Sequence, residues 1–247
     1  MSLLSLRGPV QIAPGVHQLP AIGARVTAVA GSDGVLLIDS GTRGSLSMMD
    51  AGLKKIGYSL ADVRLIVLTH AHPDHAGGLA ALVRATSAPV AVHEAEAGFV
   101  SGAEPMPSPY RLGLVARATR PIMSRLYGPP VRVEHALADG AILDWSEEIR
   151  VVHTPGHTAG SISLYLVSQR LVIVGDALQY RFRRLSGPAW AVTKDPAQAT
   201  GSLARLIPLD FGTIAFSHFV PLVGDAKGVL ERLIGQRQDR AAAEEGR

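Results

Sequence analysis

The stretch LTHAHPDHAGGL gathers three histidines and one aspartate within six positions, directly after an apolar run. In an extended segment, residues two apart point to the same side, so His70 and His72 can face one ion together. The proline that follows suits the first turn of a helix. Asp74 and His75 then project from that helix in a different direction. The spacing therefore predicts two adjacent sets of metal ligands and disfavours a solvated polar loop.

Two glycines, Gly77 and Gly78, follow the last histidine of this stretch. They would weaken an ordinary helix, because glycine is a poor helix former. A residue without a side chain also lets two backbones approach closely. We therefore expect the helix to press against another segment at this point.

The chain contains no cysteine among its 247 residues, which excludes a disulfide framework, a thiolate nucleophile and a thiolate metal site. Any metal must be held by imidazole and carboxylate groups. Apolar residues make up 47% of the chain, which suits one large domain or two closely packed halves. The net charge is only +3 and the basic residues form no long cluster. We expect a small-molecule substrate and no nucleic-acid partner.

The sequence starts with MSLLSLRGPV, whose apolar run before Arg7 is too short for a signal peptide core. No run approaches the roughly 18 apolar residues that a membrane span needs. The expectation is a cytoplasmic protein without a membrane partner.

Short buried strands alternate with amphipathic helices along the chain, a pattern typical of sheets that are covered by helices on their outer faces. The predicted strands are 25–30, 35–41, 63–68, 88–93, 148–153, 161–167, 170–177 and 213–216. The predicted helices are 44–57, a helix from the histidine motif to about 85, 196–207 and 226–236.

Residues 102–131 differ from the rest of the chain. They contain six prolines, and the stretch between Glu104 and Glu134 has five arginines and no acidic residue. We predict a helical insert with irregular ends, whose apolar face could form a homodimer contact. Residues 1–236 then form one domain and 237–247 a polar tail. The residues of the insert at helical spacing are Leu112, Val115, Thr119, Ile122 and Leu126.

Three further candidate ligands each stand at or just past the end of a predicted strand. His157 lies in HTPGHTAGS, where a Pro-Gly pair fits a tight turn that exposes the next side chain. Asp176 ends LVIVGDA, where a carboxylate after an apolar run is costly unless it is paired or binds a metal. His218 ends TIAFSH in the same way. The strand order before Asp176 also resembles the one before Asp39, which indicates a faint internal duplication.

The set HAHPDH, TPGHT, GDA and SH, in this order, resembles the metallo-β-lactamase fold superfamily of metallohydrolases, over nearly the whole chain. The resemblance implies an α+β fold, the αββα sandwich, with two mixed sheets packed face to face and helices outside. It assigns His70, His72 and His157 to one metal, and a bridging role to Asp176. The second metal would be held by Asp74, His75 and His218.

Imidazole and carboxylate ligands favour two Zn(II) ions per chain, although Fe, Mn, Co or Ni would also bind such a set. A hydroxide between two metals is nucleophilic near neutral pH, because coordination lowers the pKa of water to roughly 7. Asp74 could orient that hydroxide and so act as a catalytic residue. Thr69, Thr158 and Asp39 are candidates for supporting the ligands through hydrogen bonds.

Beside the bridging aspartate, Tyr180 resembles a tyrosine of the lactonases in this superfamily that assists at the substrate carbonyl, although the spacing is one residue longer. Tyr180 is therefore both a catalytic and a substrate-binding candidate, equally consistent with a core or loop residue. Arg181 and Arg183 could line a pocket for an anionic substrate or form a solvated loop. In this superfamily, segments placed like the insert shape the substrate pocket, so we expect it to overhang the metals.

These features favour a lactonase-like or glyoxalase-like hydrolase that cleaves a lactone, an ester or a thioester. Three alternatives stay open. A persulfide dioxygenase shares the fold but binds one iron, a β-lactam-hydrolysing enzyme would use the same two metals, and a metal-binding scaffold would have no turnover. The four remaining histidines that are not assigned to metal, His17, His93, His135 and His153, are expected to be structural.

Overall fold

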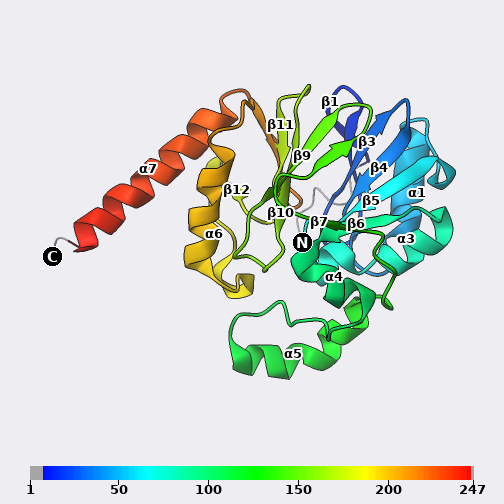
Figure 1. The fold of residues 1–247 in the computed structure, drawn as a ribbon, viewed down its shortest axis with the longest axis horizontal. Helices are drawn as coiled ribbons and strands as arrows, with labels where there is room; N and C mark the ends of the chain where they lie inside the picture. Colours follow the sequence, from blue (N-terminus) through cyan, green and yellow to red (C-terminus); the bar gives the residue numbers. More distant parts are fainter. Residues whose placement is uncertain (1–7, 246–247) are drawn as a thin grey trace.

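The structure is a computed structural model that describes residues 8–245. Two β-sheets pack face to face, and helices cover their outer surfaces (Figure 1). This is the αββα sandwich that the sequence predicts. The prediction about a signal peptide concerns residues 1–7, which lie outside the described residues.

The first sheet has seven strands that follow one another in chain order. The first four pair antiparallel, and each later strand pairs parallel with the one before it. The predicted hairpin is confirmed, with a tight turn in which Gly31 pairs with Gly34. The strands are β1 (Val10–Ala13), β2 (Val16–Leu19), β3 (Val26–Gly31), β4 (Gly34–Ile38), β5 (Val63–Val67), β6 (Val90–His93) and β7 (His135–Leu137).

The second sheet has six strands in the order β15-β14-β11-β10-β9-β8. Its pairings are antiparallel except for β11 with β14, which run parallel. A separate hairpin is formed by β12 (Gln179–Arg181) and β13 (Arg184–Ser186). The sheet strands are β8 (Ile142–Asp144), β9 (Glu148–His153), β10 (Ile162–Leu166), β11 (Leu171–Ile173), β14 (Thr213–Ala215) and β15 (Leu222–Val223).

The helices follow the predicted ones with several differences. The helix predicted after the histidine motif is divided into α2 and α3, and the one predicted at 196–207 into α6 and η4. The sequence pattern did not identify α4, η2 or η3, and α7 runs to Glu245, past the predicted end at Gln236. The extension is consistent with its alanines and glutamates, which are strong helix formers. The helices are α1 (Leu46–Lys55), η2 (Leu60–Asp62), α2 (Pro73–Ala76), α3 (Leu79–Thr86), α4 (Glu94–Ser101), α5 (Gly113–Leu126), η3 (Trp190–Val192), α6 (Pro196–Ser202), η4 (Leu203–Leu206) and α7 (Ala226–Glu245).

Three apolar clusters separate the four layers. On β4, Val35 and Leu37 belong to the cluster under the helices of the first sheet, whereas Leu36 and Ile38 belong to the cluster between the sheets. On β11, Val172 belongs to a third cluster, which lies under the helices of the second sheet. The alternation follows from the two-residue period of a strand. Both faces of each sheet are therefore buried. The candidate functional residues must then lie at the ends of the strands.

The strand pairing repeats between the halves. β2, β3 and β4 are antiparallel and β5 then adds in parallel. β9, β10 and β11 are antiparallel and β14 then adds in parallel. Asp39 follows β4 and Asp176 follows β11, so the two aspartates occupy equivalent places.

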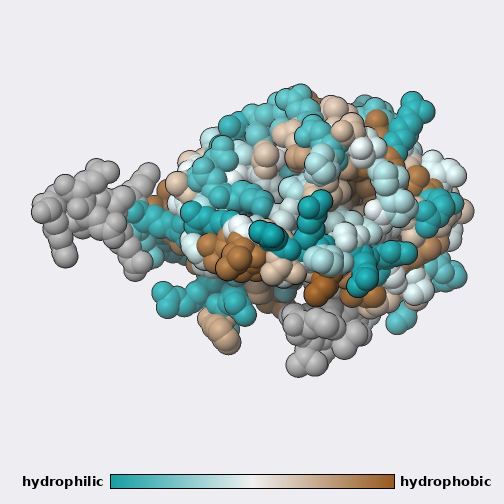
Figure 2. Space-filling view, turned by 90° about the horizontal axis from the view of Figure 1, so that it is seen from below, coloured by the Kyte–Doolittle hydropathy of each residue, from teal (hydrophilic) through white to brown (hydrophobic). Residues whose placement is uncertain are grey.

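The insert leaves the sandwich after α4 and places α5 along its lower edge (Figure 1). Seen from below, the visible surface mixes apolar and hydrophilic side chains (Figure 2). On α5, the side chains of Leu114 and Ile122 are 83% and 58% exposed. Within residues 8–245, no helix combines the length and the apolar character that crossing a membrane requires.

Candidate metal centre

The histidine motif leaves the first sheet at the end of β5. The backbone N–H of Leu68 still donates to Ala91 on β6, and the chain then turns away from the sheet. His72 has an extended backbone and directly precedes α2, whose first residue is Pro73. Asp74 and His75 lie on α2 itself, so the predicted change of direction between the two ligand pairs is confirmed.

The second sheet supplies the other three candidate ligands from the ends of its strands. His157 follows β9, Asp176 follows β11 and His218 follows β14. Gly156 has a φ of +119°, and a Cβ there would lie 2.1 Å from the backbone nitrogen of Ala199. Only glycine fits this turn, which presents His157 to the site.

These seven residues meet in one place. Their ligand atoms form three overlapping groups, and within each group all atoms lie within 4.8 Å of one another. The sequence resemblance predicted the first and the last of these groups. The groups are His70 with His72 and His157, His70 with His75 and Asp176, and Asp74 with His75 and His218.

The carboxylate of Asp176 faces both ligand sets. Its Oδ2 lies 3.6 Å from Nε2 of His157, which belongs to the first set. Its Oδ1 lies 3.2 Å from Nε2 of His218 and 3.5 Å from Nε2 of His75, which belong to the second set. One carboxylate can therefore contribute an oxygen to each of two neighbouring cations.

The polar atoms at the centre fit bound cations. Buried side-chain atoms normally have hydrogen-bond partners. Among the described residues, those without one include Nε2 of His70, Nε2 of His75 and Oδ1 of Asp176, all in this cluster. Nδ1 of His72 and Nε2 of His157 lie 3.0 Å apart, so both lone pairs can point at one ion. The donor set of nitrogen and carboxylate oxygen suits zinc and similar divalent metals.

The pKa values of the histidines differ between the two ligand sets. In the first set, burial lowers the pKa of all three histidines, and the nearby charges of other histidines contribute to this for His70 and His72. The pKa of His72 falls to about 3. These rings are neutral at neutral pH, which is the form of imidazole that binds metals.

In the second set, the histidines carry protons that a metal would replace. Burial lowers the pKa of His218, but the carboxylates of Asp176 and Asp74 outweigh this and raise it to about 10. For His75, burial is again outweighed, by Asp39 first, and the pKa is raised well above its usual value. Burial acts to raise the pKa of Asp74, yet the adjacent His75 and His218 hold it at about 2.

Asp39 supports the centre from behind, as the sequence suggested. Its Oδ2 lies 2.8 Å from Nδ1 of His75, and its Oδ1 accepts hydrogen bonds from the backbone N–H and the hydroxyl of Thr69. The Thr69 hydroxyl also lies 3.1 Å from Nδ1 of His70. Such partners fix ring orientation and the ring nitrogen that faces the metal. Thr158 bonds to Ser161 instead, and so stabilises the His157 loop.

Two supporting residues were not identified from the sequence. Glu96 on α4 is 1% exposed and accepts hydrogen bonds from the backbone N–H groups of Ala71 and Gly160. It joins the histidine motif to the loop that contains His157. Thr193 places its hydroxyl 3.2 Å from Nδ1 of His157. Neither residue lies near its partner in sequence, so no local spacing signals these contacts.

Backbone packing explains Gly77. A Cβ on Gly77 would lie 2.5 Å from the carbonyl oxygen of Leu126, at the end of α5. A Cβ on Gly78 would lie 2.3 Å from the carbonyl oxygen of Ser40. The predicted close approach of another backbone is confirmed at both positions. At Gly77 it places the insert directly beside the metal ligands.

A cavity of about 240 Å³ opens at the centre. His72, Asp74 and Asp176 line one side of it, and Met123 and Leu126 of α5 line the other. Tyr110 and Val192 complete the cover. The insert therefore covers the candidate metal centre.

Three of the predicted substrate contacts lie elsewhere. The ring of Tyr180 stacks on Phe216, with centroids 5.9 Å apart, and belongs to the apolar cluster under the helices of the second sheet. Arg181 and Arg183 line a different cavity, between the β12–β13 hairpin and α7. The pocket at the metal centre contains none of the three, so their roles at the substrate stay predictions.

Outside the ligand sets, His93 and His153 stack on each other with ring centroids 3.9 Å apart. His93 also accepts a hydrogen bond from the backbone N–H of Ala95. Both contacts are structural, in agreement with the expectation from the sequence.

Comparisons with known proteins agree with this geometry. The family model for the metallo-beta-lactamase superfamily matches residues 21–218. The protein named Probable metallo-hydrolase YflN, from Bacillus subtilis, is 28% identical over 91% of this chain and 92% of its own length. A metallo-beta-lactamase family protein from Thermus thermophilus superposes with a TM-score of 0.72 at 26% identity, over 94% of this chain and 82% of that one.

Two further relatives carry more specific names. The acyl-coenzyme A thioesterase MBLAC2 of Gallus gallus is 32% identical over 63% of this chain. A hydroxyacylglutathione hydrolase of Jannaschia is 31% identical over 74% of this chain. In both cases the match spans 57% of the relative's own length.

Proposed function

Since this chain belongs to the metallo-beta-lactamase superfamily of hydrolases, we propose that it holds two zinc ions and hydrolyses a thioester, ester or lactone. One observation carries the proposal of two ions. The two oxygens of Asp176 face different histidine sets, 3.6 Å from His157 and 3.2 Å from His218. A site for a single ion would not need a carboxylate placed between two sets.

Different residues contribute to different steps of the proposed hydrolysis. When bound, zinc lowers the pKa of a coordinated water to about 7 and polarises a carbonyl oxygen. The carboxylate of Asp74 lines the cavity and is ionised at neutral pH, so it can accept a hydrogen bond from the attacking water and orient it. Met123 and Leu126 line the same cavity and add apolar surface beside the reacting groups.

Among these substrates we propose a thioester first. Support comes from the two relatives with specific names, an acyl-coenzyme A thioesterase and a hydroxyacylglutathione hydrolase, since both names describe hydrolysis of thioesters. A β-lactam is a second candidate. Its support is weaker, because the beta-lactamase from Chitinophaga pinensis is 20% identical and shares only the fold.

The first experiment is the metal content of protein purified without chelators or nickel resin. About two zinc ions per chain, with turnover of a thioester, ester or lactone, are the expected result. One iron per chain with oxygen consumption on a persulfide would replace the proposal by dioxygenase chemistry. Asp176→Asn should lose metal and activity together, and Asp50→Asn, on the exposed face of α1, is the matched control.

The cellular location and the oligomeric state are part of the same proposal. We propose a cytoplasmic enzyme and a homodimer contact through the exposed apolar residues of α5. Fractionation of the native cells and light scattering on the purified protein test these two points.

A further inference from the structure

The cavity at the metal centre is too small for a whole substrate. Its volume is about 240 Å³, whereas sites for small organic molecules usually measure 300–1,000 Å³. It has room for the scissile bond and the atoms next to it. The rest of the substrate must extend into neighbouring space.

A larger cavity shares one lining side chain, Met123, with the cavity at the metal centre. The insert cavity, as we name it, has a volume of about 600 Å³ and lies between α5 and the loop that precedes it. No acidic residue lines the insert cavity. Its lining consists of six apolar or aromatic residues, two serines and two arginines: Pro105, Met106, Pro107, Ala116, Met123 and Tyr127, with Ser108, Ser124, Arg117 and Arg120.

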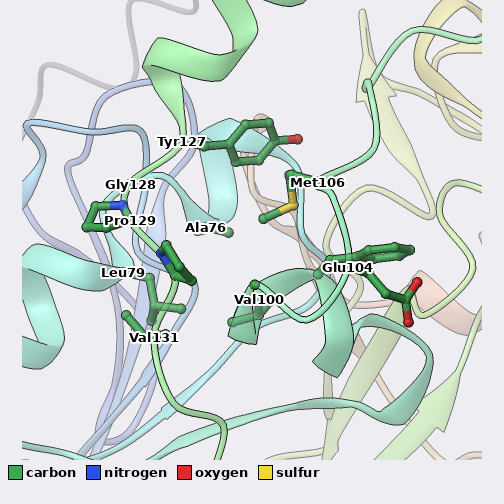
Figure 3. A pocket seen from close by; sticks show the side chains of 12 residues that line it. Ala76, Leu79, Val100, Glu104, Met106, Tyr127, Gly128, Pro129 and Val131 are labelled. Carbon is green, nitrogen blue, oxygen red and sulfur yellow. The ribbon is translucent and has the colours of Figure 1, made fainter.

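The insert cavity ends at two side chains. Met106 and Tyr127 line it on one side and a smaller cavity of about 160 Å³ on the other. Figure 3 shows these two side chains next to each other, among the residues that line the smaller cavity, which include Leu79 and Val100. The Tyr127 hydroxyl donates to the carbonyl of Pro107 at 3.3 Å. Burial, reinforced by the charges of Asp74 and Glu96, raises the pKa of Tyr127 well above its usual value, so this phenol stays uncharged.

We propose that the insert cavity binds an apolar acyl group, whose carbonyl carbon lies at the metal centre while the acyl chain passes Met123. This proposal rests on the proposed hydrolase function and names the substrate class. An apolar occupant matches the apolar part of the lining, which includes Met106, Ala116 and Met123, and the neutral tyrosine. Methionine at the junction is suited to the task, because its flexible side chain adapts to chains of different shape.

The first test compares acetyl, hexanoyl and decanoyl thioesters of N-acetylcysteamine on the zinc-loaded protein. We expect kcat/KM to rise by about fourfold for each methylene that becomes buried, until the cavity is filled. Ala116→Trp would fill the insert cavity and should remove this dependence on chain length. Ala118→Trp is the matched control, because Ala118 lies two positions away on α5 and does not line the cavity.

The second test does not require turnover. Uncleavable S-ethyl, S-hexyl and S-decyl thioethers of N-acetylcysteamine are titrated calorimetrically into the same three proteins. Wild-type protein and Ala118→Trp should bind the longer chains more tightly, with a more negative heat-capacity change, and Ala116→Trp should not. Chain-length-dependent binding without turnover would retain the acyl cavity and overturn the hydrolase function. Affinity independent of chain length in the wild type would overturn the acyl cavity, whether or not thioesters are cleaved.

Discussion

Asp39 shows how much a residue that binds no substrate can contribute to a metal centre. It is 1% exposed, and its carboxylate contacts His75 and Thr69. It also follows β4 at the place that Asp176 occupies after β11. The same topological position thus gives a ligand candidate in one half and a supporting residue in the other.

Asp39→Asn should weaken metal binding. The amide keeps the shape but removes the negative charge that orients and polarises His75. Loss of such a partner typically lowers metal affinity by 10–100-fold. Competition with a chromophoric chelator measures the change, with Asp33→Asn at the exposed β3–β4 turn as control. Equal affinities for the two variants would contradict the supporting role.

The pKa values at the two ligand sets predict two different pH dependences. His70, His72 and His157 have lowered pKa values and are already neutral at pH 7, so the first ion displaces no proton. His218, with a pKa of about 10, and His75, also raised, must lose protons. Affinity for the second ion should therefore rise with pH until about pH 10.

Chelator competition between pH 6.5 and 9, with proton release followed in weak buffer, tests this prediction. The expected release is roughly two protons for the second ion and none for the first. If both ions show the same pH dependence, the electrostatic difference between the sets is wrong.

At the scale of elements, α4 connects two loops that carry ligands. Glu96 accepts from Ala71 in the histidine motif and from Gly160 in the His157 loop. Glu96→Ala would leave two buried N–H groups without partners, each at a cost of about 1–3 kcal/mol. Urea unfolding should show a loss of roughly 2–5 kcal/mol. Glu94→Ala, on the exposed side of the same helix, should cost less than about 1 kcal/mol.

The contact between α2 and α5 is the second element-level feature. Gly77→Ala would push its Cβ to 2.5 Å from the Leu126 carbonyl and so displace the insert. We expect a lower thermal midpoint together with a higher KM, because Met123 and Leu126 would move away from the cavity. In Gly201→Ala a Cβ meets no atom within 4 Å, and this control should be neutral or stabilising by about 0.5–1 kcal/mol. If the KM of Gly77→Ala is unchanged, the insert does not contribute to substrate binding.

For the whole molecule, the candidate metal centre lies between the two sheets. Four candidate ligands follow β5 of the first sheet, and three follow β9, β11 and β14 of the second. Bound metal should therefore stabilise the sandwich as a unit, by about 2.7 kcal/mol at a metal concentration of 100 times Kd.

Removal of metal with a chelator should lower the thermal midpoint by about 5–10 °C for a chain of this size. Addition of zinc should restore it, and Asp176→Asn should reduce the difference. The same midpoint with and without metal, in protein that demonstrably binds zinc, would show that the ligands do not hold the sheets together.

Through its resemblance to the superfamily, the sequence predicted the four-layer sandwich and the seven candidate ligands that the structure brings together. Strand and helix periods are local, and each ligand stands at a recognisable place: a dense histidine motif, a Pro-Gly turn, or a polar residue that ends an apolar strand. The contacts that support the candidate ligands could be predicted from the sequence only in part. Asp39 could be suggested from the repeat, but Glu96 and Thr193 could not, because their partners lie 25 or more residues away.

Only the tertiary structure decided what surrounds the centre. Their closeness to Asp176 makes Tyr180 and Arg181 candidates for substrate contact, but it is equally consistent with core or loop positions. In the structure, β12 places Tyr180 against Phe216 and the arginine at another cavity. The resemblance predicted that the insert overhangs the metals, but only the contact at Gly77 and the packing of α5 show that Met123 and Leu126 line the cavity. Ligands follow from local chemistry, whereas a pocket is the space between elements and depends on how distant segments pack.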